Sequence, residues 1–350
     1  MAKNSLHKIL HWEHWPLLMF YVPNIPYALM HGIKEWNLVF YTAVNPGIKN
    51  SGIGSESKYE TLQMLPEKYI PKSILHEVGS EVTNTIADIK KQHIQFPVIA
   101  KPDIGFRGLL VKKIENEAAL TSYLNSYDID IIIQEFLAHE NERGIFYYRY
   151  PHEEKGTITS ITLKEFCHVV GDGISTIEAL ILKDERAKLY LHLIQENNVI
   201  DLNQIPKKEE IVKLSSIGNH SKGTKFINGN HLITQELHDS FDILNHQVDG
   251  WYYGRVDVKY HSLEALYNGE FKILEVNGIL AEPTHIYDAS KTTYFGALKI
   301  IRQHWKQLYK IAMYNHKVKK VPYRKIFPFI REMLALKAYS NRVKKMAKVN

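Results

Sequence analysis

The stretch FKILEVNG, residues 271–278, decides which fold the sequence predicts. Its apolar residues indicate a buried strand, yet this strand also carries Glu275 and Asn277. The two residues are two positions apart, so their side chains face the same side of the strand. Because carboxylates are rarely buried without a partner, the stretch predicts a ligand or charge partner for an acid and an amide on one face of a sheet.

A second strand supplies such a partner. GRVDVKY, residues 254–260, places Arg255 and Asp257 two positions apart and therefore also on one face. If the two faces meet, two carboxylates, an amide oxygen and a guanidinium converge. Hard oxygen ligands of this kind suit Mg²⁺ whose coordination is completed by substrate phosphates. The alternative is a structural Arg–Asp pair followed by a capped turn at 277–278, but two acids aligned beside an arginine favour the metal site.

A lysine and a glycine loop follow one another in PVIAKPDIGFRG, residues 97–108. Lys101 is a point charge suited to phosphate, and Gly105 and Gly108 allow backbone N–H groups to approach phosphate oxygens closely. Arg107 adds a forked donor. On its own, the segment fits a glycine hairpin with an exposed lysine better than a nucleotide loop.

The stretch IIIQEFLAHENERG, residues 131–144, contains an apolar strand followed by a linker, with Glu135 before the linker and Glu142 seven positions later. A strand that runs into a linker offers backbone groups to the edge of an adenine. One acid can reach the exocyclic amine of the adenine, and the other can accept hydrogen bonds from ribose hydroxyls. Taken alone, this segment favours the simpler interpretation, a strand followed by a charged loop.

The composition is that of an ordinary globular protein, with 350 residues, 45% hydrophobic residues and a single cysteine. One cysteine allows no disulfide framework, so we expect a reducing, cytoplasmic environment. We expect Cys167 to be a small buried hydrophobe rather than a nucleophile. No apolar run is long enough to span a membrane, and the N-terminus has no signal-peptide pattern.

Charge is concentrated at the C-terminal end. Residues 301–350 contain fourteen Lys or Arg and one acid, a net charge of +13 against +6 for the whole chain, so residues 1–300 carry −7. Such asymmetry indicates an anionic partner. We expect 297–315 to be a helix that packs on the protein. For 317–350, packing on the protein and binding to an anionic membrane both remain open. We expect no binding to nucleic acid, because no RNA- or DNA-binding motif accompanies the charge.

The periodicity predicts an α+β chain without regular strand–helix alternation. We expect helices over 57–65, 81–91, 115–127 and 175–195, the last capped by Ser175 or Thr176. We expect strands over 38–47, 97–103, 130–137, 159–173, 254–262 and 271–278, with a turn leading into a further strand over 66–75. The first 50 residues fit a shortened α/β region, and the aromatic stretch 14–23 is expected in the core, with a membrane contact as the alternative.

In this order, the segments resemble the ATP-grasp superfamily of carboxylate–amine ligases. The spacing of the two linker acids, and GRVDV followed by LEVN, look like D-alanine–D-alanine ligase. VVGDGISTIEALI (169–181) and KLSSIGNHSKGTKF (213–226) look like cyanophycin synthetase and related ligases. The resemblance covers about residues 57–290. It implies an ATP-grasp fold, in which two α+β subdomains, 57–140 and 141–296, clasp ATP. A short N-terminal α/β region, 1–56, precedes them, and a basic helical tail, 297–350, follows them.

The resemblance also implies roles for individual residues. Phosphates would be bound by Lys58 and Lys101 and covered by the loop of Gly105, Arg107 and Gly108. Adenine would be bound by Glu135 and the backbone of Leu137, and ribose by Glu142. Two Mg²⁺ ions, replaceable by Mn²⁺, would be bound by Asp257, Glu275 and Asn277. Arg255 would stabilise the acyl-phosphate and the tetrahedral intermediate, and Lys222 would reach the γ-phosphate.

The implied reaction couples a small-molecule carboxylate to a small-molecule amine. ATP first converts the carboxylate into an acyl-phosphate, and the amine then displaces phosphate. The alternatives are a phosphotransferase that stops after phosphorylation and a nucleotide-binding protein without turnover.

The chain departs from the ligases in two places. One is NGILAEPTH, residues 277–285, where the ligases usually have a Pro-Gly turn close to the acceptor amine, and the other is its shorter N-terminal region. The sequence predicts neither substrate and no oligomeric state.

Overall fold

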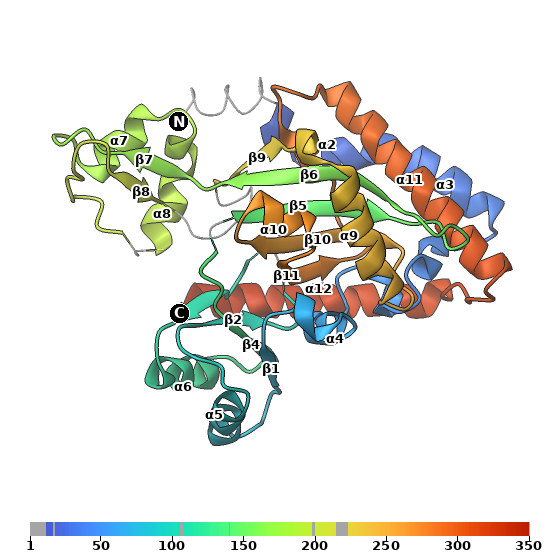
Figure 1. The fold of residues 1–350 in the computed structure, drawn as a ribbon, viewed down its shortest axis with the longest axis horizontal. Coiled ribbons are helices and arrows are strands. Elements are labelled where there is room, and N and C mark those ends of the chain that lie inside the picture. Colours follow the sequence, from blue (N-terminus) through green and yellow to red (C-terminus); the bar gives the residue numbers. More distant parts are fainter. Residues whose placement is uncertain are drawn as a thin grey trace.

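The computed structural model describes residues 12–349, except 17, 106–107, 140, 198–199 and 215–222. Within these residues, the strands form three antiparallel sheets with the orders β1-β4-β2-β3, β11-β10-β5-β6-β9 and β7-β8. Figure 1 shows the five-stranded sheet in the middle, the four-stranded sheet below it and the two-stranded sheet at one end. We call these units the central lobe, the N-terminal lobe and the small lobe. The predicted α+β class is confirmed.

The N-terminal lobe consists of one sheet with two helices packed on one of its faces. Its elements are β1 (Ser73–His76), α5 (Val82–Lys91), β2 (Val98–Pro102), β3 (Lys112–Ile114), α6 (Glu117–Ser126) and β4 (Ile131–Glu135). In β2, Val98 and Ala100 are fully buried and pack with Leu120 of α6. Lys101 follows Ala100 directly, so its side chain points to the opposite face of the strand.

The central lobe buries one face of its sheet beneath two helices. Its elements are β5 (Asn141–Tyr148), β6 (Thr157–Glu165), β9 (Lys225–Asn228), α9 (Gln235–His246), β10 (Tyr253–Tyr260), α10 (Leu263–Tyr267) and β11 (Phe271–Asn277). Val256 and Val258 of β10 pack against Phe241 of α9 in the core. The intervening positions, Arg255 and Asp257, therefore face the other side, which is the side that the sequence predicts to be functional.

The small lobe corrects two predictions. The strand expected over 159–173 is divided between β6 and β7 (His168–Val170), which pairs with β8 (Ile211–Lys213) in a separate sheet. The helix expected over 175–195 is divided into α7 (Ile177–Lys183), a 3₁₀ turn η6 (Ala187–Tyr190) and α8 (Leu191–Asn197). The break occurs at Asp184, whose carboxylate accepts hydrogen bonds from the backbone N–H groups of Arg186 and Ala187 at 2.9 and 2.6 Å.

Two other predictions in the small lobe are confirmed. The Thr176 hydroxyl caps α7 by accepting a hydrogen bond from the N–H of Ala179 at 3.2 Å. Cys167 is buried in the apolar core of the lobe, and burial raises the pKa of its thiol. The cysteine is therefore a packing residue, as its neighbours in the sequence predict.

The N-terminal region is helical, and the strand predicted over 38–47 is wrong. The described residues before Ser73 form only helices and 3₁₀ turns: η1 (Trp12–His14), α2 (Leu18–Tyr21), η2 (Val22–Asn24), α3 (Ile25–Lys34), η3 (Phe40–Ala43), η4 (Lys49–Ser51), α4 (Lys58–Gln63) and η5 (Glu67–Tyr69). Phe40, Ala43 and Val44 are buried together, a spacing of three and four that fits a helical turn and not a strand. In the stretch 14–23, Phe20 is in the core as predicted, but Leu18, Met19 and Val22 are exposed.

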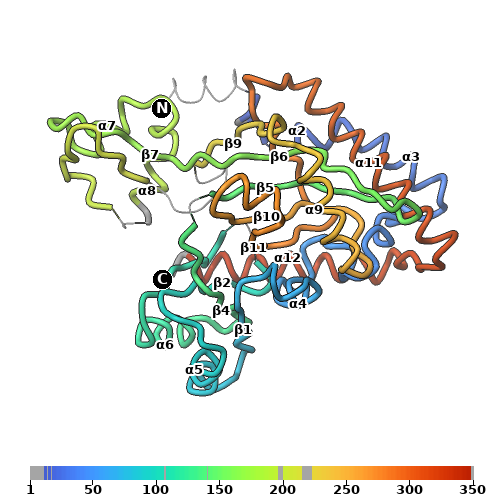
Figure 2. The backbone as a smooth tube through the Cα atoms, in the orientation of Figure 1, coloured from blue at the N-terminus to red at the C-terminus, as the bar shows by residue number. Residues whose placement is uncertain are grey.

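The basic tail forms two long helices, α11 (Tyr294–Lys317) and α12 (Ile326–Val349). α11 packs on the central lobe through Ile301, Leu308 and Ile311, which confirms the predicted packing. α12 runs alongside the lobes and ends beside the N-terminal lobe (Figure 2). The short 3₁₀ turns η8 (Asn230–Leu232) and η9 (Thr284–Tyr287) complete the described elements. Among the described residues, no helix has both the length and the apolar character needed to cross a bilayer.

Candidate active site

The two strands singled out by the sequence pair in the register that the prediction requires. Asp257 of β10 lies opposite Glu275 of β11, and Arg255 lies opposite Asn277. Directly opposed residues on antiparallel strands bring their side chains to the same face. The predicted convergence of two acids, an amide and a guanidinium is therefore confirmed.

A β-bulge in β11 adds a backbone acceptor to this face. The register shifts between Asp257 and Val258, so that Leu274 has no partner in the ladder. The carbonyl oxygen of Leu274 instead accepts a hydrogen bond from Lys101 Nζ at 3.0 Å. The side chain of Lys101 also donates to Gln134 Oε1 at 3.0 Å. The bulge thus connects the central lobe to the predicted phosphate lysine of the N-terminal lobe.

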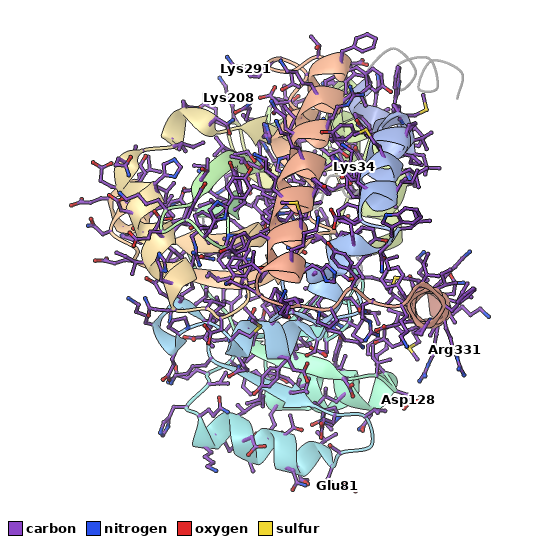
Figure 3. The ribbon with its side chains drawn as sticks, turned by 90° about the vertical axis from the view of Figure 1, so that its right-hand side faces the viewer. Lys34, Glu81, Asp128, Lys208, Lys291 and Arg331 are labelled. Carbon is purple, nitrogen blue, oxygen red and sulfur yellow. The ribbon has the colours of Figure 1, made fainter. Side chains whose placement is uncertain are left out.

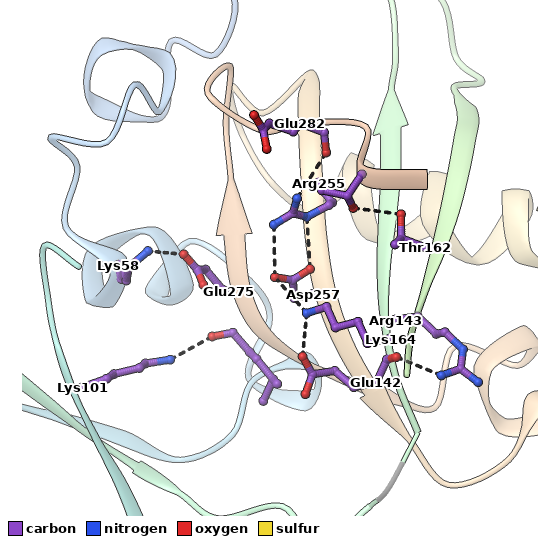
Figure 4. Close-up of polar contacts among 12 residues, drawn as sticks. Lys58, Lys101, Glu142, Arg143, Thr162, Lys164, Arg255, Asp257, Glu275 and Glu282 are labelled. Carbon is purple, nitrogen blue, oxygen red and sulfur yellow. Dashed lines mark hydrogen bonds and ion pairs between the residues drawn. The ribbon is translucent and has the colours of Figure 1, made fainter. Parts of the chain in front are cut away.

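A chain of charges crosses the sheet from β10 to β5 (Figure 4). Arg255 Nε lies 3.2 Å from Asp257 Oδ1, and Lys164 Nζ lies 3.6 Å from Asp257 Oδ2. Lys164 also forms an ion pair with Glu142 at 2.6 Å, and its side chain is only 7% exposed. The sequence prediction missed Lys164. Lys164 lies within the strand expected over 159–173, and a charged residue inside a strand is the same kind of signal that pointed to Glu275.

Lys58 reaches the same face from the start of α4. Its ammonium group forms an ion pair with the Glu275 carboxylate. The helix start is fixed by Ser57, whose hydroxyl caps the N–H of Glu60, and by Asp103, which accepts a hydrogen bond from the N–H of Tyr59 at 2.8 Å. The cap orients Lys58 toward the central lobe.

Gly105 lies beside this lysine. A Cβ atom at Gly105 would come within 3.2 Å of Lys58 Cε, so the close approach favours glycine. Gly108 has a φ of +75°, a conformation that glycine adopts without strain. The structure therefore brings Lys58, Lys101 and Gly105 to the carboxylates. Arg107 and Lys222, which the sequence also assigns to the site, lie outside the described residues.

Burial and charge oppose one another at the two central carboxylates. Burial alone would raise the pKa of Asp257, but Arg255 and Lys164 lower the pKa more strongly, so it lies below its ordinary value. Glu275 behaves in the same way, because Lys58 outweighs the effect of burial on its pKa. Both groups are therefore ionised at neutral pH.

The lysines of the site differ in their proton affinity. Burial lowers the pKa of Lys101 to about 8, and the attraction of Glu275 only partly offsets this effect. The pKa of Lys58 is raised in spite of burial, because the carboxylate of Glu275 is in direct contact with it. Lys101 is therefore the cation in the site whose charge depends on pH near neutrality.

The predicted adenine and ribose residues lie where the two lobes join. Glu135 ends β4, and its carboxylate accepts a hydrogen bond from the backbone N–H of Lys72 at 3.2 Å. The carbonyl oxygen of Leu137 accepts a hydrogen bond from Lys259 Nζ at 3.1 Å. Lys259 shares its face of β10 with Asp257 and was missed by the sequence prediction. The roles of Glu135, Leu137 and Glu142 toward a nucleotide stay predictions.

The turn after Asn277 is held by the N-terminal region, at the position where the ligases have Pro-Gly. The N–H of Ile279 donates to the Ser51 carbonyl oxygen at 3.0 Å. A Cβ atom at Gly278 would collide with that same oxygen, so only glycine fits. The Glu282 carbonyl oxygen, farther along the turn, accepts a hydrogen bond from Arg255 Nη1 at 3.2 Å. The turn therefore helps to orient Arg255.

The oxygen donors of Asp257, Glu275 and Asn277 suit a hard divalent cation. They are two ionised carboxylates and an amide on neighbouring strands, and the amide nitrogen of Asn277 is buried without a hydrogen-bond partner. In the part of the chain that the structure describes, no group of three or more His, Cys, Asp or Glu residues is placed to hold a metal ion. This donor set fits Mg²⁺ better than a metal held by protein alone, because Mg²⁺ commonly completes its shell with water and phosphate oxygens.

Two α+β lobes that meet at lysines, carboxylates and an arginine are the arrangement that the resemblance in the sequence implies. Residues 55–202, less than half of the chain, match the family described as the RimK-like ATP-grasp domain. This match confirms the resemblance seen in the sequence. A search among curated proteins found no match.

Similar solved structures include three ligases. A bifunctional glutathione synthetase from Pasteurella multocida is 16% identical with a TM-score of 0.39, and the match covers 70% of this chain and 35% of that chain. The VanG D-Ala:D-Ser ligase from Enterococcus faecalis is 14% identical (TM-score 0.43; 76% and 64% covered). A D-alanine–D-alanine ligase from Bacillus anthracis is 15% identical (TM-score 0.42; 75% and 71% covered). The chain thus spans about a third of the first protein's length and less than two thirds of the second's.

Proposed function

We propose that the protein is an Mg-ATP-dependent ligase of the cytoplasm that activates a small-molecule carboxylate as an acyl-phosphate and couples it to an amine. The observation that carries the proposal is the paired register of Arg255 with Asn277 and of Asp257 with Glu275. Lysines from the N-terminal lobe reach the same face. In this proposal the two subdomains are 57–140 and 141–296, and ATP binds between them.

The nucleotide would lie along the junction of the lobes. Its phosphates would be bound by Lys58 and Lys101, which already contact the central lobe, beneath the loop that begins at Gly105. The adenine would lie near Glu135 and Leu137, and the ribose near Glu142. Arg107, Gly108 and Lys222 would complete the phosphate contacts.

Asp257, Glu275 and Asn277 would hold Mg²⁺, or Mn²⁺ in its place. When bound, the ion would neutralise the negative charge that develops during phosphoryl transfer. Glu275 would exchange its contact with Lys58 for the ion, which would free the lysine for phosphate. The remaining cations keep the site positively charged where phosphate accumulates.

The chain's own residues would direct the chemistry. A carboxylate oxygen of the first substrate attacks the γ-phosphorus, an O–P bond forms, and the bond to ADP breaks. The amine then attacks the acyl carbon, loses a proton, and displaces phosphate. Arg255 is held by Asp257 and by the Glu282 carbonyl oxygen, so its charge is fixed in place before the reaction. Preorganised charge of this kind stabilises an anionic transition state.

The proposal is tested by measuring ADP release from the purified protein with panels of carboxylates and amines in the presence of Mg²⁺. We expect hydroxylamine, added with the correct carboxylate, to be converted into a hydroxamate, because it intercepts an acyl-phosphate. ADP release together with a stable phosphorylated product and no hydroxamate would instead indicate the phosphotransferase. ATP binding without ADP release for any substrate pair would contradict both activities.

A further inference from the structure

The N-terminal helices expose an unusually large amount of apolar side chain. Nine large apolar residues between 18 and 38 are at least 39% exposed: Leu18, Met19, Val22, Ile25, Leu29, Met30, Ile33, Trp36 and Leu38. Most of them recur every three or four positions, which places them along one side of the helical segment formed by α2, η2 and α3. A contiguous exposed stripe of this size is typical of an interaction surface.

Trp36 is the most exposed of these residues, at 96%. It follows the C-cap of α3 with a φ of +51°. The N–H of Trp36 donates to Ile33, and that of Asn37 donates to Gly32, which is the hydrogen-bond pattern of a Schellman motif. Glycine usually occupies this left-handed position, and a bulky residue there is strained. Packing within the described structure explains neither the strain nor the exposure of this tryptophan.

The stripe continues onto α12. Asn37 Nδ2 donates to the carbonyl oxygen of Arg324 at 3.1 Å, and the rings of Tyr41 and Phe329 are 6.1 Å apart. These contacts seat the start of α12 beside the end of α3. Immediately beyond them, Phe327, Ile330 and Leu334 are 83%, 48% and 63% exposed. Figure 3 shows α12 end-on, standing on the same side of the molecule as α3, with Arg331 pointing outward.

Cations surround this apolar surface. A surface hollow between the ends of α3 and α11 is lined by Lys34, Trp36, Lys317 and Lys320. Glu35, the acid in this hollow, is 3% exposed and is paired with Lys317 at 3.1 Å. Glu332 is the single acid of residues 301–350, and it is paired with both Lys49 and Arg324. The two acids near the surface are therefore already neutralised.

We propose that this face, formed by α2, α3 and α12, binds an anionic membrane surface. The exposed apolar side chains enter the boundary between headgroups and acyl chains, the tryptophan lies at headgroup level, and the lysines and arginines contact lipid phosphates. Residues 1–300 carry a net charge of −7 and residues 301–350 a net charge of +13, so an anionic surface favours an orientation with the C-terminal helices toward the lipid.

A second copy of the chain fits this face less well than lipid does. Two copies related by a two-fold axis would bring the same lysines and arginines together, and like charges in contact oppose association. The apolar residues are also spread over two separate helices. A bilayer surface accepts such an arrangement without requiring a matching shape.

The test is co-sedimentation of the full chain with vesicles of phosphatidylcholine, with and without phosphatidylglycerol. We expect binding to the anionic vesicles, weaker binding to the neutral ones, and weaker binding at high salt. Trp36→Ser with Phe327→Ser should lower the affinity about tenfold. Lys34→Glu with Arg331→Glu should lower it at least about tenfold.

The matched control is Ile174→Ser with Lys208→Glu in the small lobe, where Ile174 is 81% exposed. This variant should bind like the unmodified chain. Thermal unfolding of all variants checks that the fold is kept. No binding to anionic vesicles, or equal loss in the control, overturns the proposal. A dimer in solution that the Trp36 and Phe327 variant separates, without vesicle binding, would overturn it in favour of an interface between copies.

Discussion

Single side chains in the site are held in place by the charges of their neighbours. Glu275 illustrates this, because its carboxylate pairs with Lys58 from another lobe while it faces Asp257 across the strands. Two acids so close would repel each other if no cation stood beside them. The surrounding lysines and arginine therefore keep both acids ionised and available to a divalent cation.

Replacing Glu275 and Asn277 together with alanine should abolish ATP turnover while the fold is retained. Glu275 is 30% exposed at its side chain, so its removal leaves no large cavity. The double variant should release ADP at least about a thousandfold more slowly, because charge stabilisation of phosphoryl transfer is lost. ADP release and circular dichroism measure the two effects. Turnover that survives in the folded double variant would refute the metal assignment.

Lys101 should make ATP binding depend on pH. Burial lowers its pKa from 10.5 to about 8, so in the folded protein it is charged below pH 8 and neutral above it. The KM for ATP should therefore be constant below pH 8 and rise above it. Lys101→Arg, which stays charged, should remove the rise. A KM profile that is identical in both proteins would contradict this role.

A rise in pH should weaken ATP binding through Lys101 but should increase the contribution of Lys101 to stability. The unfolded chain keeps the proton up to its ordinary pKa, so above pH 8 the unfolded state binds more protons than the folded state does. The contribution of Lys101 to the free energy of unfolding therefore increases as the pH rises from 8 toward 10.5. Binding and stability can thus be separated by measuring both over this range.

Lys164 should contribute strongly to stability. It is 7% exposed and pairs with Glu142, while Asp257 lies within reach. Lys164→Met would leave buried carboxylates with fewer cations and should lower the free energy of unfolding by about 3 kcal/mol. The control is Lys155→Met, in an exposed pair, which should change it by less than about 1 kcal/mol. Denaturant titrations compare the two variants, and equal effects would count against the network.

Much of the site could be predicted from single residues, because the alternation of a strand is local. Arg255, Asp257, Glu275 and Asn277 were found in this way. The charge of Lys164 within an expected strand was a similar local signal. The bulge at Leu274 could not be predicted, since it depends on how β11 pairs with β10. The pairing of Lys58 with Glu275 joins residues 217 positions apart and depends on the placement of two lobes.

At the scale of elements, strands were easier to predict than the breaks between them. The stretch 38–47 has the composition of a strand but forms a 3₁₀ turn, because Asn37 and Thr42 make local hydrogen bonds to the backbone of Val39. The same kind of local competition divides the helix predicted over 175–195 at Asp184. Composition predicts neither event well, since each depends on a side chain bonding to nearby backbone.

The turn after β11 should be intolerant of any side chain. At Gly278, a Cβ atom would collide with the backbone of Ser51, so Gly278→Ala should lower the free energy of unfolding by about 2 kcal/mol or more. Gly79→Ala is the control, because it has a φ of +86° but open space around it. It should cost only about 1 kcal/mol. Similar losses in both variants would mean that the contact with Ser51 is unimportant.

At the scale of the molecule, α12 connects the N-terminal region to the N-terminal lobe. Near its start, Glu332 contacts Lys49 and Ser55 of the N-terminal region. Near its end, Val343 is fully buried in the core of the N-terminal lobe, and Arg342 pairs with Asp128 at 2.6 Å. The sequence left packing and membrane binding open for this segment. The structure shows packing along one side and exposed apolar residues on another.

Val343→Asp should release the end of α12 from the N-terminal lobe. A buried carboxylate without a partner is unfavourable, so the helix end should detach and trypsin should cleave after Lys337 or Lys344 several times faster. Ala338→Asp, at an exposed position on the same helix, is the control and should leave cleavage unchanged. Mass spectrometry of the fragments identifies the cut. Unchanged cleavage in the Val343 variant would show that this contact does not retain the helix.

A helix that is attached at both ends fixes the distance between the two parts of the molecule that it contacts. α12 has 24 residues and is about 36 Å long, with one end held against the N-terminal region and the other buried in the core of the N-terminal lobe. It therefore limits how far the N-terminal lobe can move away from the N-terminal region. If α12 binds a lipid surface as proposed, that binding would act on both of the parts to which the helix is attached.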